Sequence, residues 1–189
     1  MADSWSQDTY IKAYKFAARA HWNQKMKQLV PGTNIPYLMH FSFVAMEVIA
    51  ALEKDAGLDG NLAVQCALLH DTLEDTGTTY DQLFELFGAE VADGVAALTK
   101  GESIGENLSK GQKKRLQMVE SLEMIKKQPK EIWVVKMADR ITNLQPPPPH
   151  WTQDKINRYR EEACEIYEAL KEGDQYLSKR LKEKIEGYH

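Results

Sequence analysis

Residues 60–76 read GNLAVQCALLHDTLEDT, and this stretch decides the fold that the rest of the chain must build. Its apolar side chains recur at the spacing of one helix face, as at Leu62, Cys66 and Leu69. The apolar run then ends in an imidazole and a carboxylate, His70 and Asp71, which are side chains that ligate metals. The stretch therefore predicts a buried helix that presents metal-competent groups where the core meets a cleft.

Helical spacing recurs along most of the remaining chain, whereas the alternation typical of strands is not sustained anywhere. Capping patterns mark several helix ends. Thr79 precedes Gln82 by three residues, Ser109 precedes Gln112 in the same way, and Gly88 follows an apolar run. These signals favour a chain built almost entirely of helices.

We predict about eight or nine helices, near residues 7–29, 38–54, 60–74, 79–87, 89–99, 109–127, 130–144, 152–171 and 174–187. Residues 132–138 are β-branched enough for a strand, but good helix formers follow them to Asn143, so we interpret this stretch as a buried helix. A chain of 189 residues fits one domain. The sequence thus predicts an all-α fold, a single domain over residues 1–189 built as a bundle of about eight or nine helices.

The chain carries 24 lysines and arginines against 28 aspartates and glutamates, so its overall charge gives no reason to expect nucleic acid or an anionic membrane as a partner. The N-terminus lacks a basic-then-apolar signal, and no apolar run approaches the roughly 18 residues of a membrane span. Cys66 and Cys164 lie in apolar helical segments, where we expect buried thiols of a reducing compartment. We therefore expect a cytoplasmic protein, and the sequence leaves its oligomeric state open.

Two further metal-competent residues stand in apolar surroundings far along the chain from His70 and Asp71. His40 opens a predicted helix, and Asp139 follows an apolar run in which an unpaired carboxylate would cost several kcal/mol to bury. An ordinary ion pair with Arg140 is the alternative explanation for Asp139. One metal would satisfy both histidines and both aspartates together, and this donor set suits manganese, iron, cobalt or zinc.

Glu74 and Asp75 follow Asp71 by three and four residues. If the helix continues, this spacing places both carboxylates on the same side as the metal-competent groups. They are then candidates to orient or deprotonate an attacking water and to protonate a leaving oxygen. The alternative is a helix end that faces solvent.

Several further motifs accompany these residues. They are His70 to Thr76, Thr78-Thr79, Phe87-Gly88, Leu98-Thr99-Lys100, Phe16-Ala17-Ala18 with His21, Pro36-Tyr37 ahead of His40, and Val135 to Arg140 with Asn143-Leu144. In combination, over roughly residues 8–172, they resemble the hydrolase domain of RelA/SpoT homologues, the enzymes of the stringent response that destroy the alarmone (p)ppGpp. Because the chain has no room for a synthetase domain, it is most similar to the stand-alone small alarmone hydrolases.

The resemblance implies a single-domain HD-type helical bundle that hydrolyses the 3′-diphosphate of (p)ppGpp, releasing pyrophosphate and GDP or GTP. It also implies a Mn²⁺ ion as cofactor and roles for named residues. By resemblance the metal ligands are His40, His70, Asp71 and Asp139, the catalytic pair is Glu74 and Asp75, and Asn143 contacts the nucleotide. The expected partner is a small nucleotide substrate.

The negative charge of such a substrate must be met by local cations, for which the candidates are Lys136, Arg140, Lys100 and Lys27, and with less support the group Lys110, Lys113, Lys114 and Arg115. Two departures from the family pattern affect base recognition. The Arg-Lys pair that usually precedes Pro-Tyr-x-x-His is missing from residues 28–35, and prolines stand at 146–149 where charged residues are commoner. An adenine analogue such as (p)ppApp, or another 3′- or 5′-phosphorylated nucleotide, is therefore an alternative substrate.

A third alternative is a regulator that binds a nucleotide without turnover. Such a protein would be expected to have lost a metal ligand or the Glu-Asp pair. This sequence retains all six residues.

Overall fold

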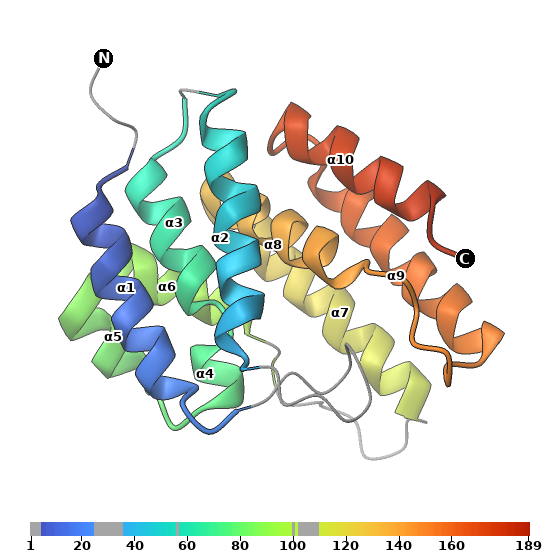
Figure 1. Cartoon of the computed structure of the whole chain (residues 1–189), viewed down its shortest axis with the longest axis horizontal. Helices are drawn as coiled ribbons and strands as arrows, with labels where there is room; N and C mark the ends of the chain where they lie inside the picture. The colour runs from blue at the N-terminus through green and yellow to red at the C-terminus, as the bar shows by residue number, and fades with distance from the viewer. Residues whose placement is uncertain (1–4, 25–35, 56, 100, 102–109) are drawn as a thin grey trace.

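The computed structural model describes residues 5–24, 36–55, 57–99, 101 and 110–189. Within these residues it contains helices and no strands, as predicted (Figure 1). The helices are α1 (Gln7–Ala20), α2 (Leu38–Leu52), α3 (Gly60–Leu69), α4 (Thr72–Asp75), α5 (Tyr80–Phe87), α6 (Ala89–Leu98), α7 (Lys110–Lys126), α8 (Lys130–Asn143), α9 (Gln153–Leu170) and α10 (Gln175–Glu186). None of these helices is both long and apolar enough to cross a membrane.

The first predicted helix, 7–29, is too long. Helix α1 ends at Ala20, and residues 21–24 form a turn in which the Gln24 N–H donates to the carbonyl of His21 at 2.8 Å. The Gln24 carbonyl then accepts from the N–H of Tyr37 at 3.2 Å, a tertiary contact that helical spacing cannot reveal. Residues 25–29 lie outside the described part of the chain.

The predicted helix 60–74 is divided into α3 and α4, which is why the described residues contain ten helices where eight or nine were expected. Side chains take over the carbonyls of the last turn of α3. Nδ1 of His70 donates to the Ala67 carbonyl at 2.9 Å, and the Thr72 hydroxyl donates to the Leu69 carbonyl at 2.7 Å. Because side chains donate to these carbonyls in place of backbone N–H groups, α3 ends at the His70-Asp71 pair.

The core lies between α2, α3 and α8, with α1 packed on α3 and α10 packed on α8 (Figure 1). Residues 132–138 are helical, which confirms the helix interpretation, and Val134, Val135 and Ala138 are fully buried. At the other end of the chain, Arg180 of α10 holds both carboxylate oxygens of the buried Glu47 on α2. The C-terminal helix is thereby joined to the same core.

The two cysteines differ in environment. Cys66 is fully buried on α3, as expected, but Cys164 is exposed on α9, so the prediction of a second buried thiol is wrong. Helix α9 is amphipathic, with Ala163 and Ile166 on its buried side, and position 164 faces away from them.

Gly94 shows how tightly α6 packs on α3 and α8. A Cβ atom at this position would lie 2.5 Å from Cδ1 of Ile132 and 3.0 Å from Sγ of Cys66. We therefore expect Gly94→Ala to lower the free energy of unfolding by about 1–3 kcal/mol, the usual cost of overpacking. Gly111→Ala on α7 is the control, because a Cβ there meets nothing within 4 Å. Chemical denaturation of both variants measures the difference, and equal stabilities would contradict this packing.

Candidate metal centre

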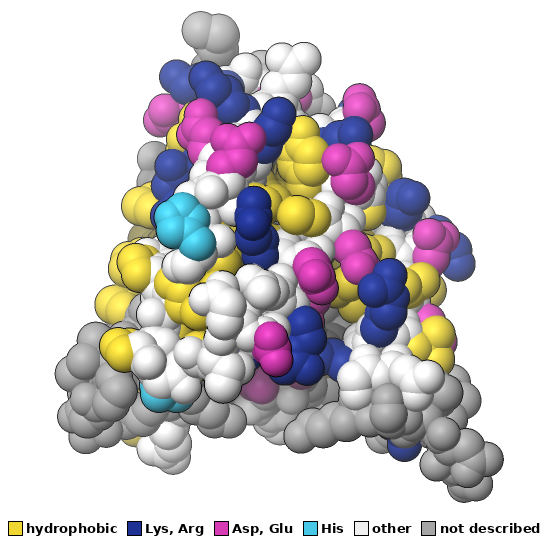
Figure 2. Space-filling model, turned by 90° about the vertical axis from the view of Figure 1, so that its right-hand side faces the viewer, with side chains coloured by type: hydrophobic (Ala, Val, Ile, Leu, Met, Phe, Trp, Pro, Cys, Tyr) yellow, Lys and Arg dark blue, Asp and Glu magenta, His cyan; other side chains and the backbone are white. Residues whose placement is uncertain are grey.

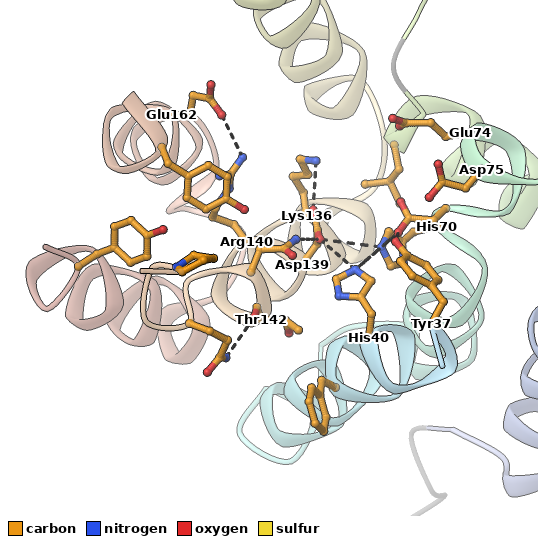
Figure 3. A pocket seen from close by; sticks show the side chains of 18 of the residues that line it. Tyr37, His40, His70, Glu74, Asp75, Lys136, Asp139, Arg140, Thr142 and Glu162 are labelled. Carbon is orange, nitrogen blue, oxygen red and sulfur yellow. Dashed lines mark hydrogen bonds and ion pairs between the residues drawn. The ribbon is translucent and has the colours of Figure 1, made fainter. Parts of the chain in front are cut away.

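Three separate parts of the fold bring the four candidate metal ligands together, and Figure 3 shows His40, His70 and Asp139 pointing toward one another. His40 lies in the first turn of α2, His70 and Asp71 lie at the break between α3 and α4, and Asp139 lies on α8. Nε2 of His40 is 3.3 Å from Nε2 of His70 and 3.4 Å from Oδ1 of Asp139, while Oδ2 of Asp71 is 2.9 Å from Nε2 of His70. Ligand atoms of His40, His70 and Asp71 all lie within 4.8 Å of one another.

Neighbouring groups fix the orientation of these ligands. Because Nδ1 of His70 donates to the Ala67 carbonyl, the neutral imidazole presents its Nε2 lone pair to the cluster. The hydroxyl of Tyr37 donates to Oδ2 of Asp71, and Lys136 approaches Oδ2 of Asp139 at 3.3 Å. Lone pairs that face one another at such distances repel unless a cation lies between them, so the donor set fits a divalent metal.

The pKa shifts within the cluster also indicate that it favours a bound positive charge. Burial by itself lowers the pKa of His70, but the carboxylates of Asp71 and Asp139 raise that pKa to about 9. Burial opposes ionisation of Asp71 and Asp139, yet His70 lowers the pKa of Asp71 and Lys136 lowers that of Asp139 well below its ordinary value. Burial, followed by the Asp71 charge, raises the pKa of Tyr37, so its hydroxyl remains a donor.

Arg140 does not form the ion pair with Asp139 that was considered as an alternative to a metal. Its Nη2 lies 3.8 Å from Oε2 of Glu162, and its guanidinium lies over the ring of Tyr159, 4.6 Å from the centroid. Lys136 pairs with Asp139 in its place. The Asp139 carboxylate is therefore partly neutralised by a lysine, and one of its oxygens still points to the two histidines.

Glu74 and Asp75 lie exposed on α4, beside the metal-ligand candidates (Figure 3). The helix does not continue from His70 as the prediction from sequence assumed; a separate short helix places both carboxylates on the cavity that His70 and Asp71 also line. Oδ2 of Asp75 accepts from Nε2 of Gln24 at 2.9 Å. Lys100 and Lys27, together with the loop 28–35 that lacks the Arg-Lys pair, lie outside the described residues.

The metal-ligand candidates form one end of a cavity of about 570 Å³. Lys136, Arg140 and Asn143 also line it, and Asn143 donates from Nδ2 to Oδ1 of Asp139 at 2.5 Å. Of the later basic group, Lys114 lines the cavity and pairs with Glu162, whereas Arg115 pairs with Glu165.

The far end of the cavity carries residues to which the sequence motifs assigned no functional role. Trp151, Lys155, Tyr159 and Tyr188 line it. Lys155 lies over the Trp151 ring at 3.8 Å, and Trp151 meets the edge of Tyr159 at 5.4 Å between centroids. The four-residue spacing of Trp151, Lys155 and Tyr159, which begins just before α9 and runs into its first two turns, was the signal that could have identified them. Figure 2 shows acidic and basic side chains interspersed over the face at the right-hand side of Figure 1, where α9 and α10 lie.

Comparison with known proteins agrees with this geometry. The model of the HD domain family matches residues 13–173. The chain belongs to this HD-domain family. Within it the chain is 33% identical to the human guanosine-3′,5′-bis(diphosphate) 3′-pyrophosphohydrolase MESH1, over 91% of this chain and 90% of that protein. The all-α HD fold and the resemblance to alarmone hydrolases are thereby confirmed.

Bacterial proteins and a solved structure extend this comparison of the HD domain. The chain is 33% identical to the guanosine-3′,5′-bis(diphosphate) 3′-pyrophosphohydrolase of Aquifex aeolicus, over 84% of this chain but 20% of that longer protein. The structure of a metazoan SpoT ortholog that hydrolyzes ppGpp matches with a TM-score of 0.74 and 26% identity, over 96% of both chains. The chain thus corresponds in extent to the small metazoan homologues.

The raised pKa of His70 predicts how the metal-free protein responds to pH. A histidine whose pKa rises from 6.5 to about 9 on folding stabilises the fold below pH 6.5 and loses that contribution as the pH rises to 9. In the presence of a chelator, we therefore expect the Tm to fall between these pH values. His70→Asn keeps a donor for Ala67 but cannot take the charge, so its Tm should fall less. Equal slopes in thermal scans of both proteins would contradict this assignment.

Proposed function

We propose that this HD-domain protein hydrolyses the 3′-diphosphate of (p)ppGpp, releasing pyrophosphate and GDP or GTP. The observation that carries the proposal is the convergence of two histidines, two aspartates and an adjacent carboxylate pair at one end of a single cavity. The names of the human and Aquifex relatives, and the activity of the metazoan SpoT ortholog, support the choice of substrate. We further propose that the protein acts in the cytoplasm.

The proposed cofactor is one Mn²⁺ ion held by His40, His70, Asp71 and Asp139. Two imidazoles and two carboxylates form a mixed nitrogen and oxygen donor set that suits this ion. When bound, the ion would supply Lewis-acid activation of water and of phosphoryl oxygens. Tyr37 and Lys136 support the site from outside, since each contacts a carboxylate of the proposed ligand set.

Other residues of the cavity are assigned proton transfer, water orientation and contacts to substrate oxygens. We assign Glu74 and Asp75 to proton transfer and water orientation, because they lie beside the ligand cluster and are exposed to the cavity. Lys136 and Asn143 contact Asp139 and also line the cavity, so each can meet a substrate oxygen without leaving its position. Proton transfer and charge neutralisation thus come from opposite sides of the ligand cluster.

Unpartnered polar atoms mark where the rest of the substrate would bind. Nε and Nη1 of Arg140, Oγ1 of Thr142 and Nε1 of Trp151 are buried, and none has a hydrogen-bond partner in the described part of the chain. Buried donors without partners are costly, and all three residues line the cavity. Anionic and hydroxyl oxygens of a nucleotide would satisfy them.

The wall formed by Pro146 and Pro148 favours a second candidate, hydrolysis of (p)ppApp or of another phosphorylated nucleotide. Both prolines line the cavity, and proline has no backbone N–H with which to read the edge of a base. Selection for guanine must therefore come from other groups of the cavity. A regulator without turnover is the least supported candidate, because the six metal-site and acidic residues are all retained and described together.

A panel of nucleotides tests the proposed reaction. We expect metal-stripped protein to release pyrophosphate from ppGpp when Mn²⁺ is added and to release none without a divalent metal. The panel includes ppApp and simple 5′-nucleotides, with products separated by anion-exchange chromatography. Faster release from ppApp would favour the second candidate. Tight binding of ppGpp without any product in the presence of Mn²⁺, Fe²⁺, Co²⁺ or Zn²⁺ would reject both enzymatic candidates.

Two substitutions separate metal binding from catalysis. Asp71→Ala removes a carboxylate that touches both histidines, so we expect it to lose the metal as well as the activity. Glu74→Gln leaves the ligand cluster unchanged, so we expect full metal content with turnover reduced about 100-fold or more, the size of a general acid–base contribution. Metal analysis by mass spectrometry and steady-state kinetics measure both effects. Full turnover in the Glu74 variant would remove this residue from the mechanism.

A further inference from the structure

The turn that follows α1 forms a chain of hydrogen bonds that leads to Asp75. His21 is buried, and its Nδ1 lies 2.6 Å from Oε1 of Gln24. Nε2 of Gln24 in turn donates to Oδ2 of Asp75 at 2.9 Å. A residue of the α1 turn thereby holds a carboxylate of α4, 51 positions further along the chain.

The chemistry of the three groups fixes the direction of these bonds. An ionised carboxylate only accepts, so the amide nitrogen of Gln24 must face Asp75 and the amide oxygen must face His21. His21 must then donate, which places its proton on Nδ1. Burial lowers the pKa of His21, so the neutral ring with a single N–H is favoured. Each group therefore sets the orientation of the next.

Further contacts fix Gln24 and His21, the two residues of the α1 turn that form these hydrogen bonds. The backbone N–H of Gln24 donates to the carbonyl of His21 at 2.8 Å, and the carbonyl of Gln24 accepts from the N–H of Tyr37 at 3.2 Å. The His21 ring packs on Tyr37, with 4.9 Å between centroids, and against Phe41, with 5.9 Å. The backbone of Gln24 and the ring of His21 are thereby fixed, and the two side-chain hydrogen bonds orient the Gln24 amide so that its NH₂ group faces Asp75.

On the basis of the proposed function, we propose that His21 and Gln24 are positioning residues for the hydrolysis, acting through Asp75. Gln24 engages Oδ2 of Asp75, which leaves Oδ1 as the oxygen through which this carboxylate contacts water or substrate. His21 keeps the Gln24 amide in the donating orientation. A role limited to joining α1 to α4 would affect stability and not turnover.

Gln24→Leu tests the bond to Asp75, because leucine has nearly the same size and cannot donate. We expect kcat for ppGpp to fall about ten- to a hundred-fold, the range found for groups that orient catalytic ligands, with metal content and Tm little changed. Asn23→Leu is the matched control, since Asn23 is an exposed amide in the same turn. A Gln24 variant with normal kcat, or one whose loss follows only from a lower Tm, would overturn the proposal.

Substitutions of His21 test the direction of the hydrogen bonds, in which His21 donates to Gln24. The amide nitrogen of asparagine can replace Nδ1 as a donor, so His21→Asn should retain most of the kcat that His21→Leu loses. In the Gln24→Leu background, His21→Leu should cause little further loss, because the two residues act through one carboxylate. Losses that multiply in the double variant, or equal losses in the two His21 variants, would show that His21 acts independently of Gln24.

An NMR measurement tests the geometry without any substrate. Long-range ¹H–¹⁵N spectra of histidine-labelled protein should show His21 as the neutral Nδ1–H tautomer, and the Gln24→Leu variant should change its Nδ1 shift. The Nε2–H tautomer in the wild-type protein would overturn the chain of bonds. Absence of ppGpp turnover in the wild-type protein would instead overturn the proposed function, and with it the role of His21 and Gln24 in hydrolysis, while the hydrogen bonds seen by NMR would stand, so the two failures are distinguishable.

Discussion

The structure depends on the close approach of two imidazole nitrogens and two carboxylate oxygens. These four atoms come from α2, the α3–α4 break and α8, and the distances between histidine nitrogens and carboxylate oxygens run from 2.9 to 3.9 Å. Such a group is stable only with positive charge at its centre, whether that charge is a proton or a metal ion. The raised pKa of His70 and the lowered pKa values of Asp71 and Asp139 are consequences of this one constraint.

The helical core explains how such a costly arrangement is held in place. Helices α2, α3 and α8 pack on one another through fully buried small and branched side chains, and each contributes at least one member of the cluster at or near an end of its buried face. The break after Leu69 turns a continuous helix into two. This break matters for function, because it aims Asp71 at the histidines and still places Glu74 and Asp75 beside them.

The cavity is chemically divided along its length. Acceptors gather at the end formed by α2, α3, α4 and α8, whereas donors and aromatic rings gather at the end formed by α8, α9 and the C-terminus. Under the proposed function, one phosphate group would lie near the ligand cluster, where the proposed metal ion would neutralise its charge, and the remainder would lie among Arg140, Trp151 and Lys155. The similarity to MESH1 over nearly the whole chain is consistent with that placement.

The sequence alone determined the all-helical class, most helix positions and the identity of the clustered residues, because apolar periodicity and the chemistry of histidine and aspartate are local properties. It did not determine the break within 60–74 or the end of α1 at Ala20, since side-chain contacts to carbonyls and the pairing of Gln24 with Tyr37 arise only after folding. For the same reason the sequence assigned Arg140 no partner beyond its neighbour Asp139. The tertiary structure gives it Glu162 and Tyr159, because only packing brings α9 against α8.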